Sequence, residues 1–146
     1  MASELSIDPI QYTEPFRKNV NGRLRARFKL DSDRKPIHLR GGRLDPRFRH
    51  YEINLFLDSP FSDQISRVLY YIDDPTFDAK EGSSKDRDNC FCEEIQTYGD
   101  VPIKVTVFID DRKILQEAWL SQMLINGHAG DMNPAIKNAI ERIKLN

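Results

Sequence analysis

The sequence predicts an all-β protein, an immunoglobulin-like antiparallel β-sandwich with a short C-terminal helix. Short segments of alternating apolar and polar residues recur along the chain, and turn-forming Gly, Pro and Asp residues separate them. The clearest helical pattern lies close to the C-terminus. With 146 residues, 39% of them hydrophobic, the chain fits one domain, which we place at residues 21–146 after an N-terminal extension at residues 1–20.

Three segments in the first half of the chain have the pattern of strands. Residues 23–30 alternate strictly between basic and apolar side chains, which is typical of a strand with one buried face. Residues 51–57 also alternate, and residues 65–72 form a third strand. Pro75 ends this third strand, because proline has no N–H to donate to a neighbouring strand.

The middle of the chain predicts one long loop and two more strands. The polar residues 80–89 indicate an exposed loop, and residues 90–95 a short strand. Tyr98 and Gly99 then form a tight connection to a strand at residues 103–109, in which apolar side chains recur at every second position.

The C-terminal third contains one ambiguous segment and one clear helix. Residues 114–125 fit either a helix or a strand, and we favour a strand because a hairpin is the shorter connection after residue 109. Asn133 has the character of an N-cap, and Pro134 is suited to the first helical position. Ile136, Ile140 and Ile143 follow at helical spacing.

Composition and charge limit the possible classes of protein. No apolar run reaches the roughly 18 residues that cross a bilayer, and the first residues lack the layout of a secretory signal, so we expect a soluble, cytoplasmic protein with no membrane partner. The net charge is −1, but residues 23–49 carry ten basic and three acidic side chains, and residues 58–111 five basic and thirteen acidic ones. Either two solvated faces attract one another, or the acidic loops select a cationic ligand.

No pattern for catalysis or metal binding was found. The three histidines lack metal-ligand spacing and are interpreted as surface or turn residues. Cys90 and Cys92 are interpreted as reduced, partly buried strand residues, and residues 86–89 lack the glycine and the closing glutamate of a calcium loop. The sequence also lacks a nucleophile elbow and a phosphate-binding glycine loop. We therefore expect a binding module, not an enzyme, with no catalytic residue, metal or cofactor.

Residues 51–109 resemble the YEATS domain, in particular its prokaryotic branch. Three segments carry the resemblance: Val68-Leu69-Tyr70-Tyr71-Ile72, Asp73-Asp74-Pro75-Thr76-Phe77 and Thr97-Tyr98-Gly99-Asp100. YEATS domains are immunoglobulin-like sandwiches that, in eukaryotes, read acylated lysine on histone tails through an aromatic slot between two loops. The resemblance implies a ligand site made of Asp74, Thr76, Phe77, Tyr98, Gly99 and Asp100.

The chemistry of a lysine ligand gives these residues their roles. An acylated lysine ends in a flat amide, which Phe77 and Tyr98 could sandwich while Thr76 and the backbone near Gly99 provide polar contacts. Asp74 occupies the position where the family carries histidine. A slot with this carboxylate could instead take an unmodified, cationic lysine, which the two rings would attract through cation–π interactions.

The expected partner is a peptide or protein that presents an acylated or cationic lysine. The alternative is a protein–protein interaction or scaffold domain of a bacterial signalling or defence system without acyl-lysine binding, which would use its sheet faces or the strand that contains Trp119. Nucleic-acid binding is disfavoured, because only Phe48 and Tyr51 could provide stacking beside the basic segment. That segment contains Arg40, Arg43, Arg47 and Arg49. The sequence leaves the oligomeric state open.

Overall fold

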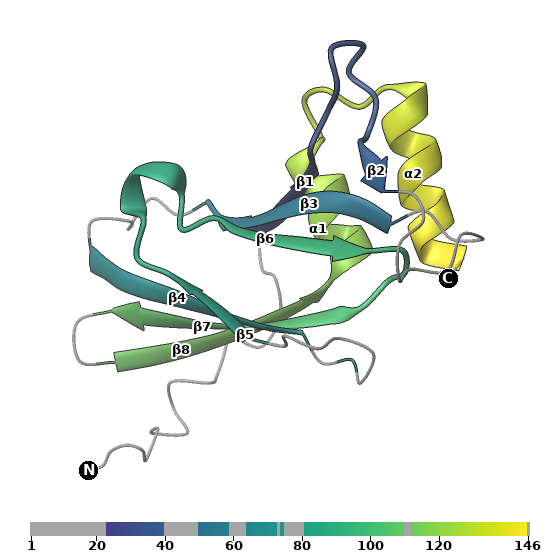
Figure 1. The fold of residues 1–146 in the computed structure, drawn as a ribbon. Helices are drawn as coiled ribbons and strands as arrows, with labels where there is room; N and C mark the ends of the chain where they lie inside the picture. Colours follow the sequence, from purple (N-terminus) through teal and green to yellow (C-terminus); the bar gives the residue numbers. More distant parts are fainter. Residues whose placement is uncertain are drawn as a thin grey trace.

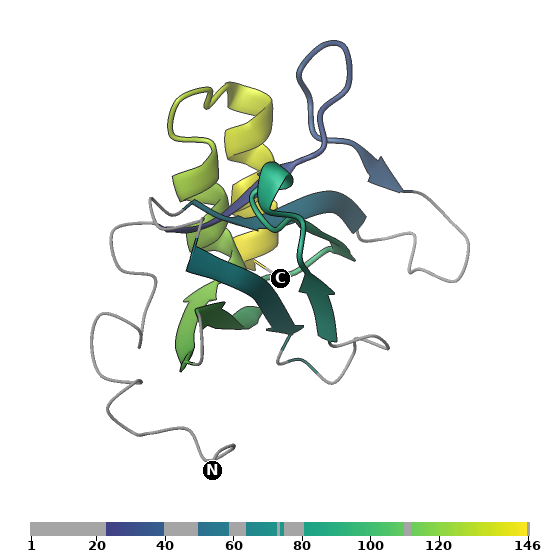
Figure 2. The same ribbon diagram turned by 90° about the vertical axis from the view of Figure 1, so that its left-hand side faces the viewer.

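Two antiparallel sheets packed face to face make up the body of the molecule (Figure 1). The computed structural model describes residues 23–39, 50–58, 64–72, 74, 81–109 and 112–145. Within these residues each sheet has four strands. Two helices, α1 (Leu120–Gly127) and α2 (Pro134–Leu145), lie side by side at the β1 side of the first sheet (Figure 1 and Figure 2). The predicted sandwich class is therefore confirmed.

The chain passes between the two sheets more than once. The first sheet contains β1 (Leu24–Phe28), β2 (His38–Leu39), β3 (His50–Leu57) and β6 (Glu93–Thr97). The second has the order β5-β4-β7-β8, with bounds β4 (Ile65–Ile72), β5 (Glu81–Ser84), β7 (Pro102–Ile109) and β8 (Arg112–Trp119). The chain thus crosses between the sheets after β3, after β5 and after β6.

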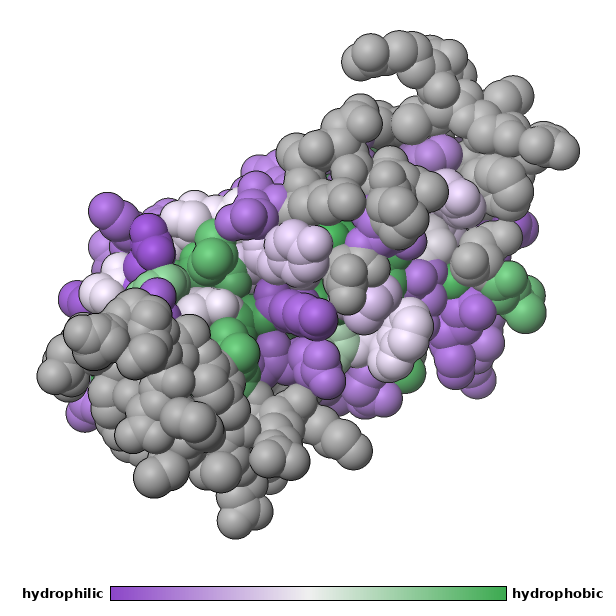
Figure 3. Space-filling model, turned by 90° about the horizontal axis from the view of Figure 1, so that it is seen from below, coloured by the Kyte–Doolittle hydropathy of each residue, from purple (hydrophilic) through white to green (hydrophobic). Residues whose placement is uncertain are grey.

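Alternating side chains from both sheets meet in the core. β1 and β3 bury every second residue, as their apolar–polar patterns predict. β4 and β7 do the same from the opposite sheet. The outer face of the second sheet, seen from below in Figure 3, presents a mixture of hydrophobic and hydrophilic side chains. Among the described residues, no helix is long and apolar enough to span a membrane.

The loop and strand predicted for residues 80–95 are partly wrong. Residues 85–90 are exposed, as expected, but β5 precedes them and pairs with β4, and a short 3-10 helix lies at Arg87–Asn89. Cys90 is exposed rather than in a strand, and both it and Phe91 have positive φ, 53° and 55°. This left-handed turn brings the Phe91 ring into the core, where the Tyr70 hydroxyl donates a 2.7 Å hydrogen bond to the Phe91 carbonyl.

The strand predicted for residues 114–125 is correct only as far as Trp119. The chain changes there from β8 to α1, so the expectation of a single helix was wrong. Leu120, Met123 and Leu124 are fully buried at helical spacing, which explains why this segment fitted both patterns. The C-terminal helix is confirmed, because the Asn133 side-chain oxygen accepts the Ile136 N–H at 2.8 Å as an N-cap does.

The interpretation of the histidines as surface or turn residues is wrong for His50, which is a buried residue of β3, whereas His128 lies in the turn after α1 but is fully buried. His128 is 0% exposed and His50 is 8% exposed. Both are held by partners distant in sequence, since His128 accepts a hydrogen bond from Phe28 and His50 packs against Tyr98. The basic segment at residues 40–49 lies outside the described residues.

Candidate functional site

The two loops predicted to form the ligand site leave the sandwich at the same end. Ile72, the last residue of β4, pairs with Ile103 near the start of β7, and Tyr51 pairs with Thr97 at the end of β6. The segments that follow β4 and β6 therefore start from adjacent strand ends, at the right of Figure 1. Four of the six predicted site residues are described, and Thr76 and Phe77 lie outside the described residues.

A hydrogen-bonded turn holds Tyr98 in place. The buried Thr97 hydroxyl donates to the Gly99 carbonyl at 3.1 Å and accepts the Gly99 N–H at 3.2 Å. Gly99 is itself buried, and its N–H is already used within the turn. This pair of bonds fixes the backbone on both sides of Tyr98, whose side chain remains partly exposed.

His50 supports the Tyr98 ring from β3. The ring centroids of His50 and Tyr98 are 5.0 Å apart at an interplanar angle of 62°, an edge-to-face arrangement. The register between β3 and β6 places these residues next to each other at the end of the sheet. Sequence reasoning missed His50, and only the pairing of its strand with β6 would have revealed it.

Asp100 connects the same turn to α1. One of its carboxylate oxygens accepts the Ser121 N–H at 2.9 Å, and the other accepts the Ser121 hydroxyl at 2.7 Å. Asp100 therefore caps the first turn of the helix, a role that an aspartate from a separate loop can fulfil. Asp74, the remaining described residue of the predicted site, is partly exposed just beyond β4, and its N–H donates to the Ile72 carbonyl at 3.0 Å.

Removing the Asp100 carboxylate is expected to destabilise the fold moderately. Asp100→Ala leaves the Ser121 N–H at the helix start without its acceptor, which should lower the free energy of unfolding by about 1 kcal/mol. Urea unfolding monitored by circular dichroism measures this loss. Asp88→Ala, at an exposed position in the 3-10 helix, is the matched control and should stay within about 0.5 kcal/mol of the wild type. An Asp100→Ala variant as stable as this control would contradict the capping role.

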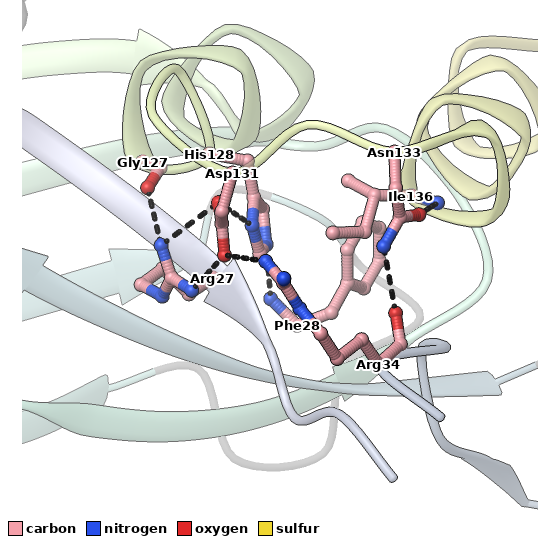
Figure 4. Close-up of polar contacts among 8 residues, drawn as sticks. All are labelled: Arg27, Phe28, Arg34, Gly127, His128, Asp131, Asn133 and Ile136. Atoms are coloured by element: carbon pink, nitrogen blue, oxygen red, sulfur yellow. Dashed lines mark hydrogen bonds and ion pairs between the residues drawn. The ribbon is translucent and has the colours of Figure 1, made fainter. Parts of the chain in front are cut away.

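A buried histidine and a partly exposed aspartate, His128 and Asp131, form a pair elsewhere in the molecule, between β1 and the α1–α2 connection (Figure 4). His128 accepts the Phe28 backbone N–H on Nε2 at 3.0 Å, so the neutral ring carries its proton on Nδ1, 3.0 Å from an Asp131 carboxylate oxygen. Both ring nitrogens are thus committed to structural contacts and cannot move a substrate proton. Burial lowers the pKa of His128, which agrees with a neutral ring.

Arg27, which is partly exposed, completes the cluster with His128 and Asp131. Its guanidinium donates to the Gly127 carbonyl at 2.7 Å and to Asp131 at 2.5 Å. The hydrogen bond from Arg27 lowers the pKa of Asp131 to about 2. The cluster joins the helices to the edge of β1. In the part of the chain that the structure describes, no group of three or more histidine, cysteine or acidic side chains could hold a metal ion.

Comparison with known proteins agrees with this architecture. Residues 51–118 match the sequence family of the prokaryotic YEATS domain. This segment resembles a prokaryotic YEATS domain. The match runs from Tyr51 in β3 to Ala118 in β8, so it includes the second sheet except Trp119, and it includes every predicted site residue. Comparisons with curated proteins and with solved structures gave no match. β1 and the two helices are additions to the matched YEATS-like region.

Proposed function

We propose that this YEATS-like domain is a non-enzymatic binding module that takes a peptide lysine, acylated or unmodified, between the loops at residues 73–80 and 98–101. The observation that carries the proposal is the position of Tyr98. It is a partly exposed aromatic residue, fixed by the Thr97 turn, at the sandwich end from which both loops leave.

The rigidity of Tyr98 favours binding. A side chain that is ordered before the ligand arrives loses little conformational entropy on binding. The Thr97 hydrogen bonds restrain the backbone of the turn, and His50 restrains the ring from one edge. A ring held in this way can stack on a flat acyl amide or attract an ammonium group.

The charge near Tyr98 favours the basic surroundings of a lysine in a peptide. Asp74 and Asp100 both lie at this end, and residues 58–111 carry eight more acidic than basic side chains. Asp100 is bonded to Ser121, so its main local role is to hold the turn in place. Asp74 is the described carboxylate that would face a cationic ligand, in the position where the YEATS family carries histidine.

Peptide titration tests the proposal. Three versions of one basic peptide, with its lysine unmodified, acetylated or carrying a longer acyl chain, are titrated to millimolar concentration while amide resonances are followed by NMR. Shifts at Tyr98, Gly99 and Asp74 are expected, and Tyr98→Ala should weaken binding about fivefold or more, since a stacked ring contributes about 1 kcal/mol or more. The peptide that binds best identifies the acylation state.

The control for this experiment is a second aromatic-to-alanine change far from the site. Phe56 is a half-buried aromatic residue on β3, near the opposite end of the strand from His50, and Phe56→Ala should leave the affinity unchanged. If none of the three peptides shifts the resonances at millimolar concentration, the lysine-binding proposal is wrong. Equal weakening by both variants would contradict a site at Tyr98.

Trp119 favours a second function, protein–protein interaction without lysine recognition. Its side chain is 56% exposed, and it pairs with Pro102, which follows the turn that contains Asp100. Exposed tryptophan is a frequent anchor of protein interfaces. In this case a protein partner purified with the domain would be lost from Trp119→Ala and retained by Tyr98→Ala. Lysine recognition gives the opposite pattern.

A further inference from the structure

The outer face of the second sheet has a row of two leucines and one threonine at its middle. The inward-facing residues of β4 and β7 and Ile114 of β8 are buried, so the residues between them point outward. The strand register places Leu69, Thr106 and Leu115 side by side in one row across this face. Figure 3 views this face from below, with hydrophobic side chains interspersed among hydrophilic ones.

One row of outward side chains flanks this central row on each side. The flanking rows combine cations, aromatic rings and one carboxylate, again in the order β4, β7, β8. The first row is Arg67, Phe108 and Lys113, and the second row is Tyr71, Lys104 and Glu117. Each residue of the first row thus has, on the same strand, a residue of the second row whose charge or aromatic ring would attract it.

We propose that two copies of this chain pair through this face as a symmetric homodimer. The twofold axis would run above the row of Leu69, Thr106 and Leu115 and parallel to it. This axis would lay the first flanking row of one copy on the second flanking row of the other. Sheets that pack face to face keep their strands within about 30° of one another, so this alignment is compatible with ordinary sheet packing.

All three contacts between the flanking rows are then attractive. Lys113 meets Glu117 of the second copy as an ion pair. Phe108 meets Lys104 of the second copy, and Tyr71 meets Arg67 of the second copy, which are two cation–π contacts. The twofold axis generates every contact twice. Leu69 and Leu115 meet their own counterparts at the axis and exclude water from the centre.

The cations already lie against this face in the single chain. The guanidinium carbon of Arg67 is 4.1 Å from the centroid of the Phe108 ring, and the Lys113 ammonium is 5.5 Å from it. These side chains therefore extend along the sheet instead of projecting from it. A flat surface of this kind allows a second sheet to approach closely enough for the leucines to touch.

The size of the face indicates a weak dimer. The four strands of this sheet, three of eight residues and one of four, lie about 4.8 Å apart and cover roughly 400 Å² in each copy at about 3.3 Å per residue. The total for the two copies, roughly 800 Å², is below the value of about 1,000 Å² that most specific interfaces exceed and in the range of weak, transient pairs. We therefore expect a weak dimer that separates on dilution.

Charge reversal at one contact gives a specific test by sedimentation velocity between about 1 and 500 μM. Lys113→Glu places two carboxylates opposite each other at both symmetric contacts, and Glu117→Lys places two ammonium groups there. Each single variant should raise the dissociation constant at least tenfold. An equimolar mixture of the two variants should form a heterodimer at the wild-type concentration, because each repulsive pair becomes an ion pair.

Two control variants test whether the effect of charge reversal is specific to the sheet face. Lys137→Glu and Glu141→Lys make the same charge changes at exposed positions on α2 and should leave self-association unchanged. Circular dichroism verifies that each variant is folded. A wild type that is monomeric at 500 μM overturns the proposal. It is also overturned by a dimer that both single reversals leave intact, or by a mixture of the variants that stays monomeric. The test needs no peptide, so its outcome is independent of lysine binding.

Discussion

Gly127→Ala is expected to lower the free energy of unfolding by about 2–4 kcal/mol, although alanine is ordinarily the better helix former by about 1 kcal/mol. Gly127 is the last residue of α1, and it lies directly against β1. A methyl group at this position would be only 1.9 Å from the Ala26 carbonyl oxygen and 2.9 Å from its carbon. Since both atoms belong to the backbone of a paired strand, the helix itself must move away.

Chemical denaturation followed by circular dichroism measures this loss of stability. Gly130→Ala is the matched control, because a methyl group there meets nothing within 4 Å, and it should change stability by less than about 1 kcal/mol. If the two variants are equally stable, the close approach of α1 to β1 is not a constraint on the fold.

The contact at Gly127 explains how the molecule protects an open sheet edge. β1 lies at an edge of the first sheet, where unpaired N–H and C=O groups could recruit another strand. The end of α1 covers this edge, and His128 accepts the hydrogen bond that Phe28 would otherwise offer to a neighbour. The helices that follow the YEATS-like match thus complete the sandwich by closing one of its edges.

Local patterns in the sequence predicted most of the strands. Alternation needs only neighbouring residues, and it identified β4 with its observed bounds and most of β1, β3 and β7. The pattern failed where distant partners decide the structure. α1 begins at Leu120 because Asp100, on a loop 21 residues earlier, caps Ser121. That contact cannot be inferred from the helical spacing alone.

The candidate site was predicted in outline for a similar reason. The motif around Tyr98 is local, and the pairing of Ile72 with Ile103 brings its loop to the same end as the loop after β4. His50 was missed because its role depends on the register between β3 and β6. The roles of Thr76 and Phe77 stay predictions.

His128 and Asp131, which form a cluster with Arg27, make the stability depend on pH in two separate ranges. Burial lowers the pKa of His128 from its ordinary value of 6.5, so the unfolded chain binds a proton more readily than the folded chain. The stability is therefore complete above about pH 7.5 and decreases as the pH falls through 6.5. The pKa of Asp131, lowered from 3.8 to about 2, adds a second loss as the pH falls from about 4 to 2.

His128→Phe is expected to lower the free energy of unfolding by about 2–3 kcal/mol at pH 7.5, because the buried Phe28 N–H loses its acceptor. The new ring keeps most of the volume and can still stack on Phe28, whose centroid is 5.7 Å from that of His128, so a cavity is not the cause.

The same variant separates the hydrogen bond from the proton equilibrium. Below pH 6.5 the wild type must keep His128 neutral against its tendency to bind a proton, because a second ring proton would point at the Phe28 N–H. His128→Phe has no such proton, so the difference in stability between variant and wild type should narrow from pH 7.5 to 5. Urea denaturation at half-unit pH steps measures it. If the difference in stability stays constant over this range, the pKa of His128 is the same in the folded and the unfolded chain, and the predicted lowering of this pKa is wrong.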